Sequence, residues 1–175
     1  TLLLITPFRF NYYDSRFKSE IRMYRLLEEC KWEEIISEYQ ANSKSPTNQM
    51  IMCKNLALLH LNRLGEEGFN TGMVGDSPTK QGDLKVGMAQ TIAPLLYYHH
   101  GCINYANNWA LNNIAKYGLS VRNLKILIRC AVMNNEPELA LKYTAILRTT
   151  TFHKQWASEW LEYSFNAHSA KECQD

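Results

Sequence analysis

Residues 86–118 read VGMAQTIAPLLYYHHGCINYANNWALNNIAKYG, which is two helical patterns joined by the short turn Gly101-Cys102. Gly118 is a natural end for the second pattern, because glycine commonly closes a helix. Three further turns of this kind stand on either side of the stretch: Cys30-Lys31, Gly65-Glu66 and Asn135-Glu136. Successive turns are 35, 36 and 34 residues apart, so the chain has a regular internal period.

A period in the mid-thirties, with one helix on each side of a short turn, indicates stacked helical hairpins of the tetratricopeptide kind. The positions where paired helices cross support this reading. Ala106 and Ala110 are small in the third unit, as are Ala140 and Thr144 in the fourth. We therefore predict an all-α fold, a tetratricopeptide-like helix-hairpin repeat array (α-solenoid), which forms one domain over residues 15–168.

The second unit departs from this pattern. Helical periodicity is lost between Gly65 and Asp83, and the stretch contains repeated turn residues: Gly65, Gly68, Gly72, Gly75, Pro78 and Gly82. Long segments without regular structure are uncommon inside compact domains and are often functional. We expect one irregular, loop-containing repeat in which the second helix is missing.

Local signals place the individual helices. Ser15 can cap a helix that ends near Glu29, and we expect its inner face to carry Ile21, Tyr24, Leu27 and Leu26. A helix from about Lys85 to His100 contains Pro94 and should be kinked there. Thr47 or Asn48, Ser120 and Pro137 mark the starts of three further helices, and a last one is expected from about His153 to Ala167.

The first 14 residues differ from the rest of the chain. Residues 1–6 are apolar, and residues 7–13 (PFRFNYY) are dense in aromatic side chains. This order is typical of a chain leaving a bilayer through its aromatic interfacial zone. Six residues are too few to span a hydrocarbon core, which needs about 20. We expect residues 1–14 to be a membrane-proximal leader, the end of a membrane span; an extended leader packed on the first helix is the alternative.

Composition excludes several classes of protein. The net charge is +2, and the chain has no dense basic cluster, so we expect no nucleic-acid partner. It contains no HExxH, P-loop, nucleotide-binding glycine fingerprint or GxSxG sequence. The adjacent residues His99 and His100 point about 100° apart on a helix and cannot readily hold one metal ion. We expect no metal or cofactor, and we expect the five cysteines to be small core residues.

A family resemblance rests on Tyr97-Tyr98-His99-His100-Gly101, followed by Asn104, Ala106 and Ala110. These residues resemble the strongest motif of an uncharacterised bacterial family of multi-spanning inner-membrane proteins that end in a tetratricopeptide-like soluble domain. Other similar marks follow in the same order: Asn55-Leu56-Ala57-Leu58, Leu64-Gly65, Ala140, Lys142-Tyr143, Leu147, Thr151-Phe152, Lys154 and Trp156-Ala157. Asn134-Asn135 replaces the glycine-containing turn that is usual there.

The resemblance implies an inner-membrane protein whose helical domain lies outside the bilayer, on the periplasmic side, and it implies no known activity. Two functions remain open. The domain is either a noncatalytic interaction or scaffold module that binds a protein or peptide, or an accessory substrate-contacting domain of a membrane enzyme or transporter. In either case the parent membrane region is a partner. The candidate binding groove consists of Tyr97, Tyr98, His99, Asn104, Phe69 and Arg129.

Overall fold

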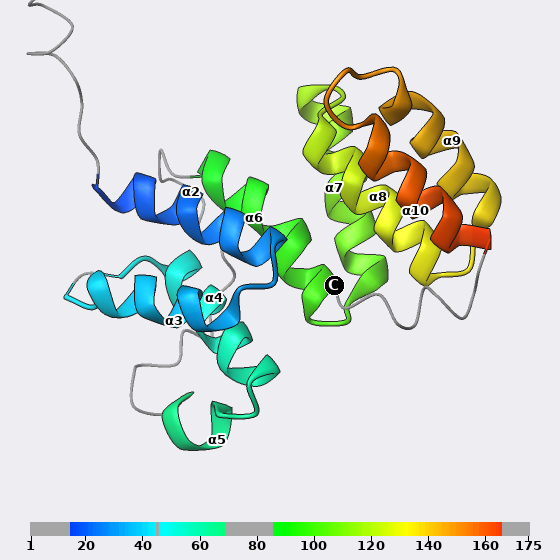
Figure 1. The fold of residues 1–175 in the computed structure, drawn as a ribbon. Helices are drawn as coiled ribbons and strands as arrows, with labels where there is room; N and C mark the ends of the chain where they lie inside the picture. Colours follow the sequence, from blue (N-terminus) through cyan, green and yellow to red (C-terminus); the bar gives the residue numbers. More distant parts are fainter. Residues whose placement is uncertain (1–14, 45, 69–85, 166–175) are drawn as a thin grey trace, which may run out of the picture.

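A computed structural model describes residues 15–44, 46–68 and 86–165, and the regular elements in these ranges are all helices (Figure 1). They are α2 (Ser15–Glu28), α3 (Trp32–Ala41), α4 (Asn48–His60), α5 (Leu64–Glu67), α6 (Val86–His99), α7 (Ile103–Tyr117), α8 (Val121–Met133), α9 (Pro137–Arg148) and α10 (Lys154–Phe165). The all-α class predicted from the sequence is confirmed. The leader 1–14, the segment 69–85 and residues 166–175 lie outside the described residues.

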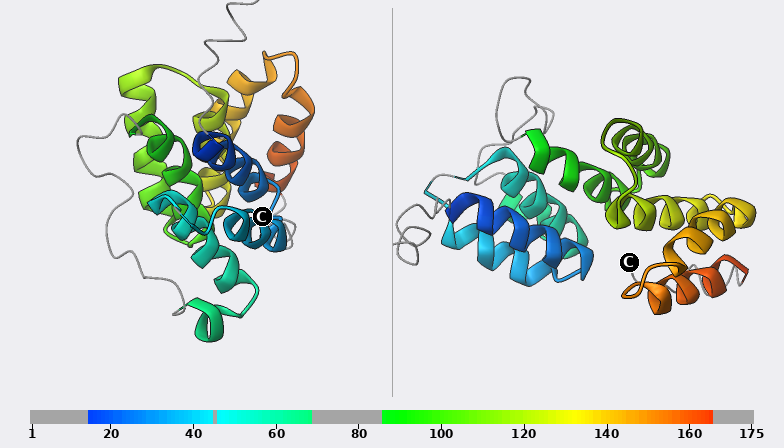
Figure 2. Two further views of the ribbon diagram at one scale, coloured as in Figure 1. Left: turned by 90° about the vertical axis from the view of Figure 1, so that its left-hand side faces the viewer. Right: turned by 90° about the horizontal axis from the view of Figure 1, so that it is seen from above.

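The helices form two layers, as a hairpin array requires. Each of α2, α4, α6 and α8 contacts the next helix of the series, which ends at α10. Helices α3, α7 and α9 alternate with them, and each packs on the helices that precede and follow it in the chain. Helix α6 joins the two ends of the array, because it contacts α2 and α4 on one side and α7 and α8 on the other (Figure 2). The repeat architecture is therefore confirmed as well.

Each of the four hairpin turns passes through one residue with a left-handed backbone: Cys30 (φ 54°), Asn62 (φ 56°), Gly101 (φ 80°) and Asn135 (φ 59°). The same hydrogen bonds close all four turns. The amide of the left-handed residue donates to the carbonyl three residues earlier, and the next amide donates to the carbonyl five residues earlier. This is the Schellman arrangement, which satisfies the last carbonyls of a helix.

The second turn lies at Asn62-Arg63, and the predicted position at Gly65-Glu66 is wrong. Gly65 is the second residue of the short helix α5. Asparagine adopts the left-handed conformation with little strain, because its short polar side chain can hydrogen-bond locally. The unit is irregular as predicted, since its second helix α5 has only four residues.

Helix ends follow the expected local chemistry. The hydroxyl of Thr47 accepts a hydrogen bond from the Met50 amide at the start of α4, and the hydroxyl of Ser120 accepts one from Asn123 at the start of α8. Pro137 is the first residue of α9, where its missing amide hydrogen costs nothing. Gly118 ends α7 with φ 86°. These four expectations are confirmed.

Two clusters of buried side chains make up the core. The first draws on α2, α3, α4, α6, α7 and α8, and the second on α8, α9 and α10. The small residues at the hairpin crossings, Ala106, Ala110, Ala140 and Thr144, are fully buried. Helix α8 belongs to both clusters, because Leu127 faces the first and Ile128 faces the second.

Some details of the predicted core are wrong. We expected Ile21 to face inward on α2, but it is 39% exposed. Met23 is fully buried in its place. The face that α2 buries is centred on Met23, Leu26 and Leu27, because the helix is turned slightly from the face that the apolar pattern favoured. Among the cysteines, Cys53 and Cys130 are buried as expected, whereas Cys102 is exposed beside a turn.

Candidate functional site

Three of the six predicted groove residues meet inside the molecule. Tyr98 and His99 lie at the end of α6, and Arg129 lies on α8; their exposed fractions are 6%, 8% and 3%. The Arg129 guanidinium carbon is 5.7 Å from the centroid of the Tyr98 ring, and the Tyr98 and His99 rings are 5.3 Å apart. At this burial these side chains support the surface above them.

Arg129 is surrounded by aromatic rings from two helices. In addition to Tyr98, the rings of Trp156 and Trp160 on α10 have their centroids 5.6 Å from its guanidinium carbon. An arginine over aromatic faces is stabilised by about 2 kcal/mol when the contact is desolvated. Arg129 therefore fastens α10 to α6 across the inner layer of the array.

His99 belongs to a second group of rings at the turn ends of the first three units. Trp32, the first residue of α3, stacks on His60, the last residue of α4, at 4.1 Å with the planes 3° apart. The edge of His99 meets Trp32 at 5.4 Å, and His60 Nε2 lies 3.2 Å from the His99 carbonyl oxygen. The group thus joins α3, α4 and α6, one helix from each of three consecutive units.

The environment of His99 favours the neutral imidazole. Burial lowers the pKa of His99 to about 3, and the charges of Arg129 and His60 act in the same direction, whereas the Leu27 backbone opposes them. Neither ring nitrogen makes a hydrogen bond of good geometry within the described residues. His99 is therefore an uncharged core residue at neutral pH.

The other three predicted groove residues lie apart from this interior group. Tyr97 packs against Tyr105 at 4.6 Å and Trp109 at 6.3 Å, on the side of α6 that faces α7. Asn104 is exposed at the start of α7, and its side-chain oxygen accepts a hydrogen bond from Asn134 at 3.3 Å. Phe69 lies outside the described residues. Binding by these six residues stays a prediction.

Sequence reasoning did not select the residues that complete the two ring groups: Trp32, His60, Trp156 and Trp160. Trp32 and His60 had a usable signal, because each stands within two residues of a left-handed turn residue, where consecutive hairpins stack. Trp156 and Trp160 stand four residues apart on α10 and so share one face. That spacing alone could not show that the face covers Arg129.

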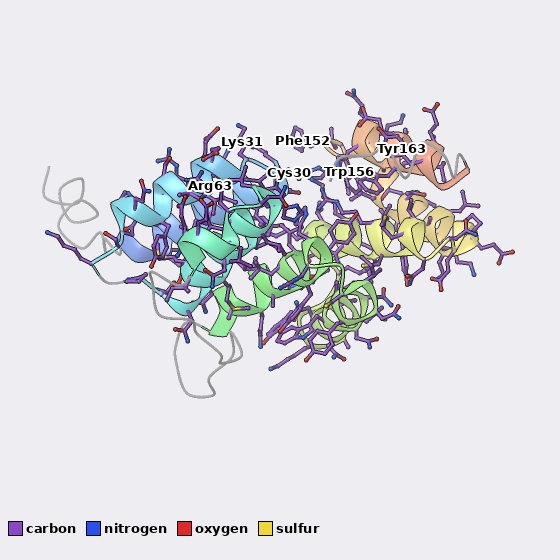
Figure 3. All side chains as sticks on the ribbon, turned by 90° about the horizontal axis from the view of Figure 1, so that it is seen from below. Cys30, Lys31, Arg63, Phe152, Trp156 and Tyr163 are labelled. Carbon is purple, nitrogen blue, oxygen red and sulfur yellow. The ribbon has the colours of Figure 1, made fainter. Side chains whose placement is uncertain are left out.

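The surface above Arg129 is formed by the α2–α3 turn and the start of α10. Lys125 connects the two, because its Nζ lies 2.9 Å from Glu28 Oε1 and 5.0 Å from the Trp156 ring centroid. Lys31 stands in the turn, and Phe152, which is 92% exposed, precedes α10 (Figure 3). We call the surface made by Lys31, Lys125, Phe152 and Trp156 the α2–α10 edge.

A separate hollow of about 520 Å³ opens between α6, the end of α7 and the start of α8. Its lining includes amide, hydroxyl and guanidinium side chains, and the lining residues are Gln90, Thr91, Asn113, Tyr117, Ser120, Val121, Arg122 and Asn123. Arg122 is the charged residue among them, and its guanidinium carbon lies 5.6 Å from the Tyr24 ring centroid. We call this feature the polar hollow.

Comparison with known families finds a match over residues 2–173, to a family of unknown function, DUF6057. The chain belongs to this family. Comparisons of the DUF6057 chain with curated proteins and with solved structures gave no significant match. The expected membership of an uncharacterised family is confirmed, whereas the membrane spans that the resemblance implied stay a prediction.

The helices and the ionisable side chains of the DUF6057 chain have two further properties. Within residues 15–44, 46–68 and 86–165, no helix combines the length and apolarity that a bilayer crossing demands. In the same ranges, no three side chains of the His, Cys, Asp and Glu types are grouped as metal ligands.

Proposed function

We propose that this chain is a noncatalytic protein-interaction domain of a membrane-anchored bacterial protein, and that it binds a protein or peptide segment at the α2–α10 edge. The observation that carries the proposal is Phe152. A phenylalanine that is 92% exposed contributes almost nothing to the fold, yet it stands beside the half-buried Trp156. Aromatic side chains are enriched at the centres of protein interfaces.

The setting of Phe152 supports this role. Lys125 places a cation 5.0 Å from the Trp156 ring centroid, which suits a segment that carries both acidic and apolar residues. The buried contacts of Arg129 beneath the edge hold Trp156 in place. Arrays of helical hairpins bind partners along such extended surfaces, because neighbouring units present them side by side.

A capture experiment with matched baits tests the proposal. The wild-type chain, Phe152→Ser and Leu119→Ser are immobilised, and proteins retained from a membrane extract of the source bacterium are compared by quantitative mass spectrometry. Leu119 is 66% exposed on the α7–α8 loop and serves as the control. We expect at least one protein to be retained by wild type and Leu119→Ser and to be lost with Phe152→Ser. Equal retention by all three baits would refute binding at the edge.

Membrane anchoring and periplasmic exposure are parts of the same proposal. They are supported by the sequence of residues 1–14, which passes from an apolar run to an aromatic cluster. The test is the full-length parent fused after the domain to a reporter enzyme that is active only in the periplasm. We expect this reporter to be active in the membrane fraction. If instead only a second fusion, to a reporter that is active in the cytoplasm, shows activity, the domain lies on the cytoplasmic side.

The polar hollow favours a second candidate, an accessory domain that contacts the substrate of a membrane enzyme or transporter. Its volume lies in the range of small-molecule sites, and its amides and hydroxyls match the hydroxyl groups of a sugar. Ligand-observed NMR with simple hexoses and with their N-acetyl derivatives tests this role. We expect saturation transfer that is lost in Asn123→Ala, and transfer that is unchanged by this substitution would argue against a sugar site.

A further inference from the structure

The outward face of α2 carries both large apolar side chains and cations. Phe17 and Ile21 are 51% and 39% exposed, and Lys18, Arg22 and Arg25 are exposed beside them. Positions 17, 18, 21, 22 and 25 lie within one half of the helix circumference, opposite the buried residues Met23, Leu26 and Leu27. One face thus combines two large apolar side chains with three cations.

Most of the acidic groups near this face, among the described residues, are buried or paired with residues outside it. Glu20 points inward and is 3% exposed. Glu28 is bound to Lys125 at 2.9 Å, and Glu29 is bound to Lys31 at 2.6 Å. Glu38 of α3 is bound to Arg22 at 3.3 Å, and its own side chain is only 12% exposed. Among the described residues, the outward face thus carries three cations, and the carboxylate paired with one of them, that of Glu38, is of low exposure.

Arg122 extends the positive surface beyond α2. Its guanidinium carbon lies 5.6 Å from the Tyr24 ring centroid, which places an exposed α8 cation next to the middle of α2. A helix face that mixes exposed aromatic and aliphatic side chains with lysine and arginine is suited to an anionic bilayer surface. A folded protein partner would need no such excess of cations, whereas phosphate headgroups would be neutralised by it.

We propose that the outward face of α2, made by Phe17, Lys18, Ile21, Arg22 and Arg25, docks on the surface of an anionic phospholipid bilayer. The two apolar side chains enter the headgroup region, and the cations bind the lipid phosphates. The sequence agrees with this placement, since α2 follows directly on residues 1–14, with their aromatic cluster. The proposal does not depend on the α2–α10 edge, which is a different surface.

Vesicle partitioning tests the proposal. The 175-residue chain is mixed with vesicles of phosphatidylcholine alone and with vesicles that contain phosphatidylglycerol in addition, and the bound fraction is measured by co-sedimentation. Residues 1–14 are present in every sample, so any binding that they cause alone is common to all variants. We expect tighter partitioning to the anionic vesicles and weakening of it by salt. Equal partitioning to both kinds of vesicle would overturn the proposal.

Two variants locate the binding face. Lys18→Gln with Arg25→Gln should weaken partitioning to anionic vesicles by about 30-fold, the effect expected for two cations at a bilayer surface. The matched control is Lys142→Gln with Lys154→Gln, which removes the same charge from exposed positions on α9 and α10. Phe17→Ser with Ile21→Ser should weaken partitioning to anionic vesicles by about 10-fold. Equal effects of the two charge variants would show that only net charge matters and would overturn the assignment to α2.

Two further measurements distinguish bilayer docking from loss of the fold and from binding of free phosphate. Far-ultraviolet circular dichroism and the melting temperature show whether each variant keeps the fold, and a misfolded double variant is replaced by its two single substitutions. Inorganic phosphate is added at the same ionic strength as a chloride control. If phosphate alone releases the chain from vesicles, the face is a site for free phosphate, and the bilayer proposal fails.

Discussion

The side-chain amide of Asn113 donates to the backbone carbonyl of Gln90, which lies 2.9 Å away on the neighbouring helix. This carbonyl is the one that Pro94 leaves without an intrahelical donor, because proline four residues later has no amide hydrogen. Pro94 is fully buried, and Asn113 is only 7% exposed. The α7 side chain thus completes the hydrogen bonding of α6 at the point where Pro94 removes the helix's own donor.

Replacement of Asn113 by leucine should therefore destabilise the fold. Asn113→Leu keeps the size of the side chain but leaves the Gln90 carbonyl buried without its donor, and we expect a loss of about 1–3 kcal/mol in the free energy of unfolding. In the background Pro94→Ala, the restored amide can serve the same carbonyl. The loss should then shrink by about 1 kcal/mol, measured by urea denaturation as a double-mutant cycle. Additive effects would show that the two positions are not coupled.

The left-handed turns allow a comparison of two glycines. A Cβ added to Gly101 or to Gly65 would meet no atom within 4 Å, so neither substitution causes a clash. Gly101 has φ 80°, whereas Gly65 lies in the helix α5. We expect Gly101→Ala to lower the free energy of unfolding by about 1 kcal/mol and Gly65→Ala to raise it by up to about 1 kcal/mol. Urea midpoints at unchanged slope provide the test, and a shift of the same sign for both would contradict the assigned turn.

His99 should make the stability depend on pH. The folded protein keeps its ring neutral down to about pH 3, whereas the unfolded chain takes up a proton near the ordinary pKa of 6.5. The unfolded state therefore binds more protons between these values, and stability falls as the pH drops below 6.5. At pH 5 the loss from this residue is on the order of 2 kcal/mol.

Denaturation at pH 7.5 and at pH 5.0 measures this effect. In His99→Phe, the difference in stability between the two pH values should be smaller than in wild type by roughly 2 kcal/mol. The neighbouring His100 is exposed, so His100→Gln is the matched control and should keep the wild-type difference. If the stability of His99→Phe differs between the two pH values by as much as that of wild type, another group causes the acid sensitivity.

Arg129 should be important for the attachment of α10. Arg129→Met keeps a long side chain but removes the charge above Trp156 and Trp160. We expect the free energy of unfolding to fall by about 1–3 kcal/mol. Arg148→Met removes a charge from an exposed position at the end of α9 and should cost less than about 0.5 kcal/mol. Thermal melts followed by near-ultraviolet circular dichroism, which reports on the tryptophans, compare the two. A similar melting temperature for both would contradict the role of Arg129.

Much of the fold could be predicted because hairpin arrays repeat their local chemistry. Caps and breakers act over a few residues, so Thr47, Ser120, Pro137 and Gly118 placed their helix ends from the sequence alone. The second turn was misplaced, because a glycine and an asparagine compete for the left-handed position and the sequence gives no rank between them.

The site was less predictable than the fold. Tyr98, His99 and Arg129 were selected as groove residues, but periodicity could not show that they meet in the interior or that α10 covers them. Exposure depends on contacts between helices far apart in the chain, such as Lys125 with Glu28. Ile21 is the opposite case, since a residue that fits an inward pattern lies outside once Met23 fills the space.

Helix α8 presents opposite sides to two separate cores, and the second core is built only from α8 and the two helices that follow it. Opening of that second core would leave the fully buried side chains of the first in place. The terminal pair is therefore expected to fray as a unit ahead of global unfolding, and its amides should exchange with solvent faster than those of α6. A protease that attacks transiently opened chains would accordingly trim the array from this end and leave a shorter, still ordered remnant.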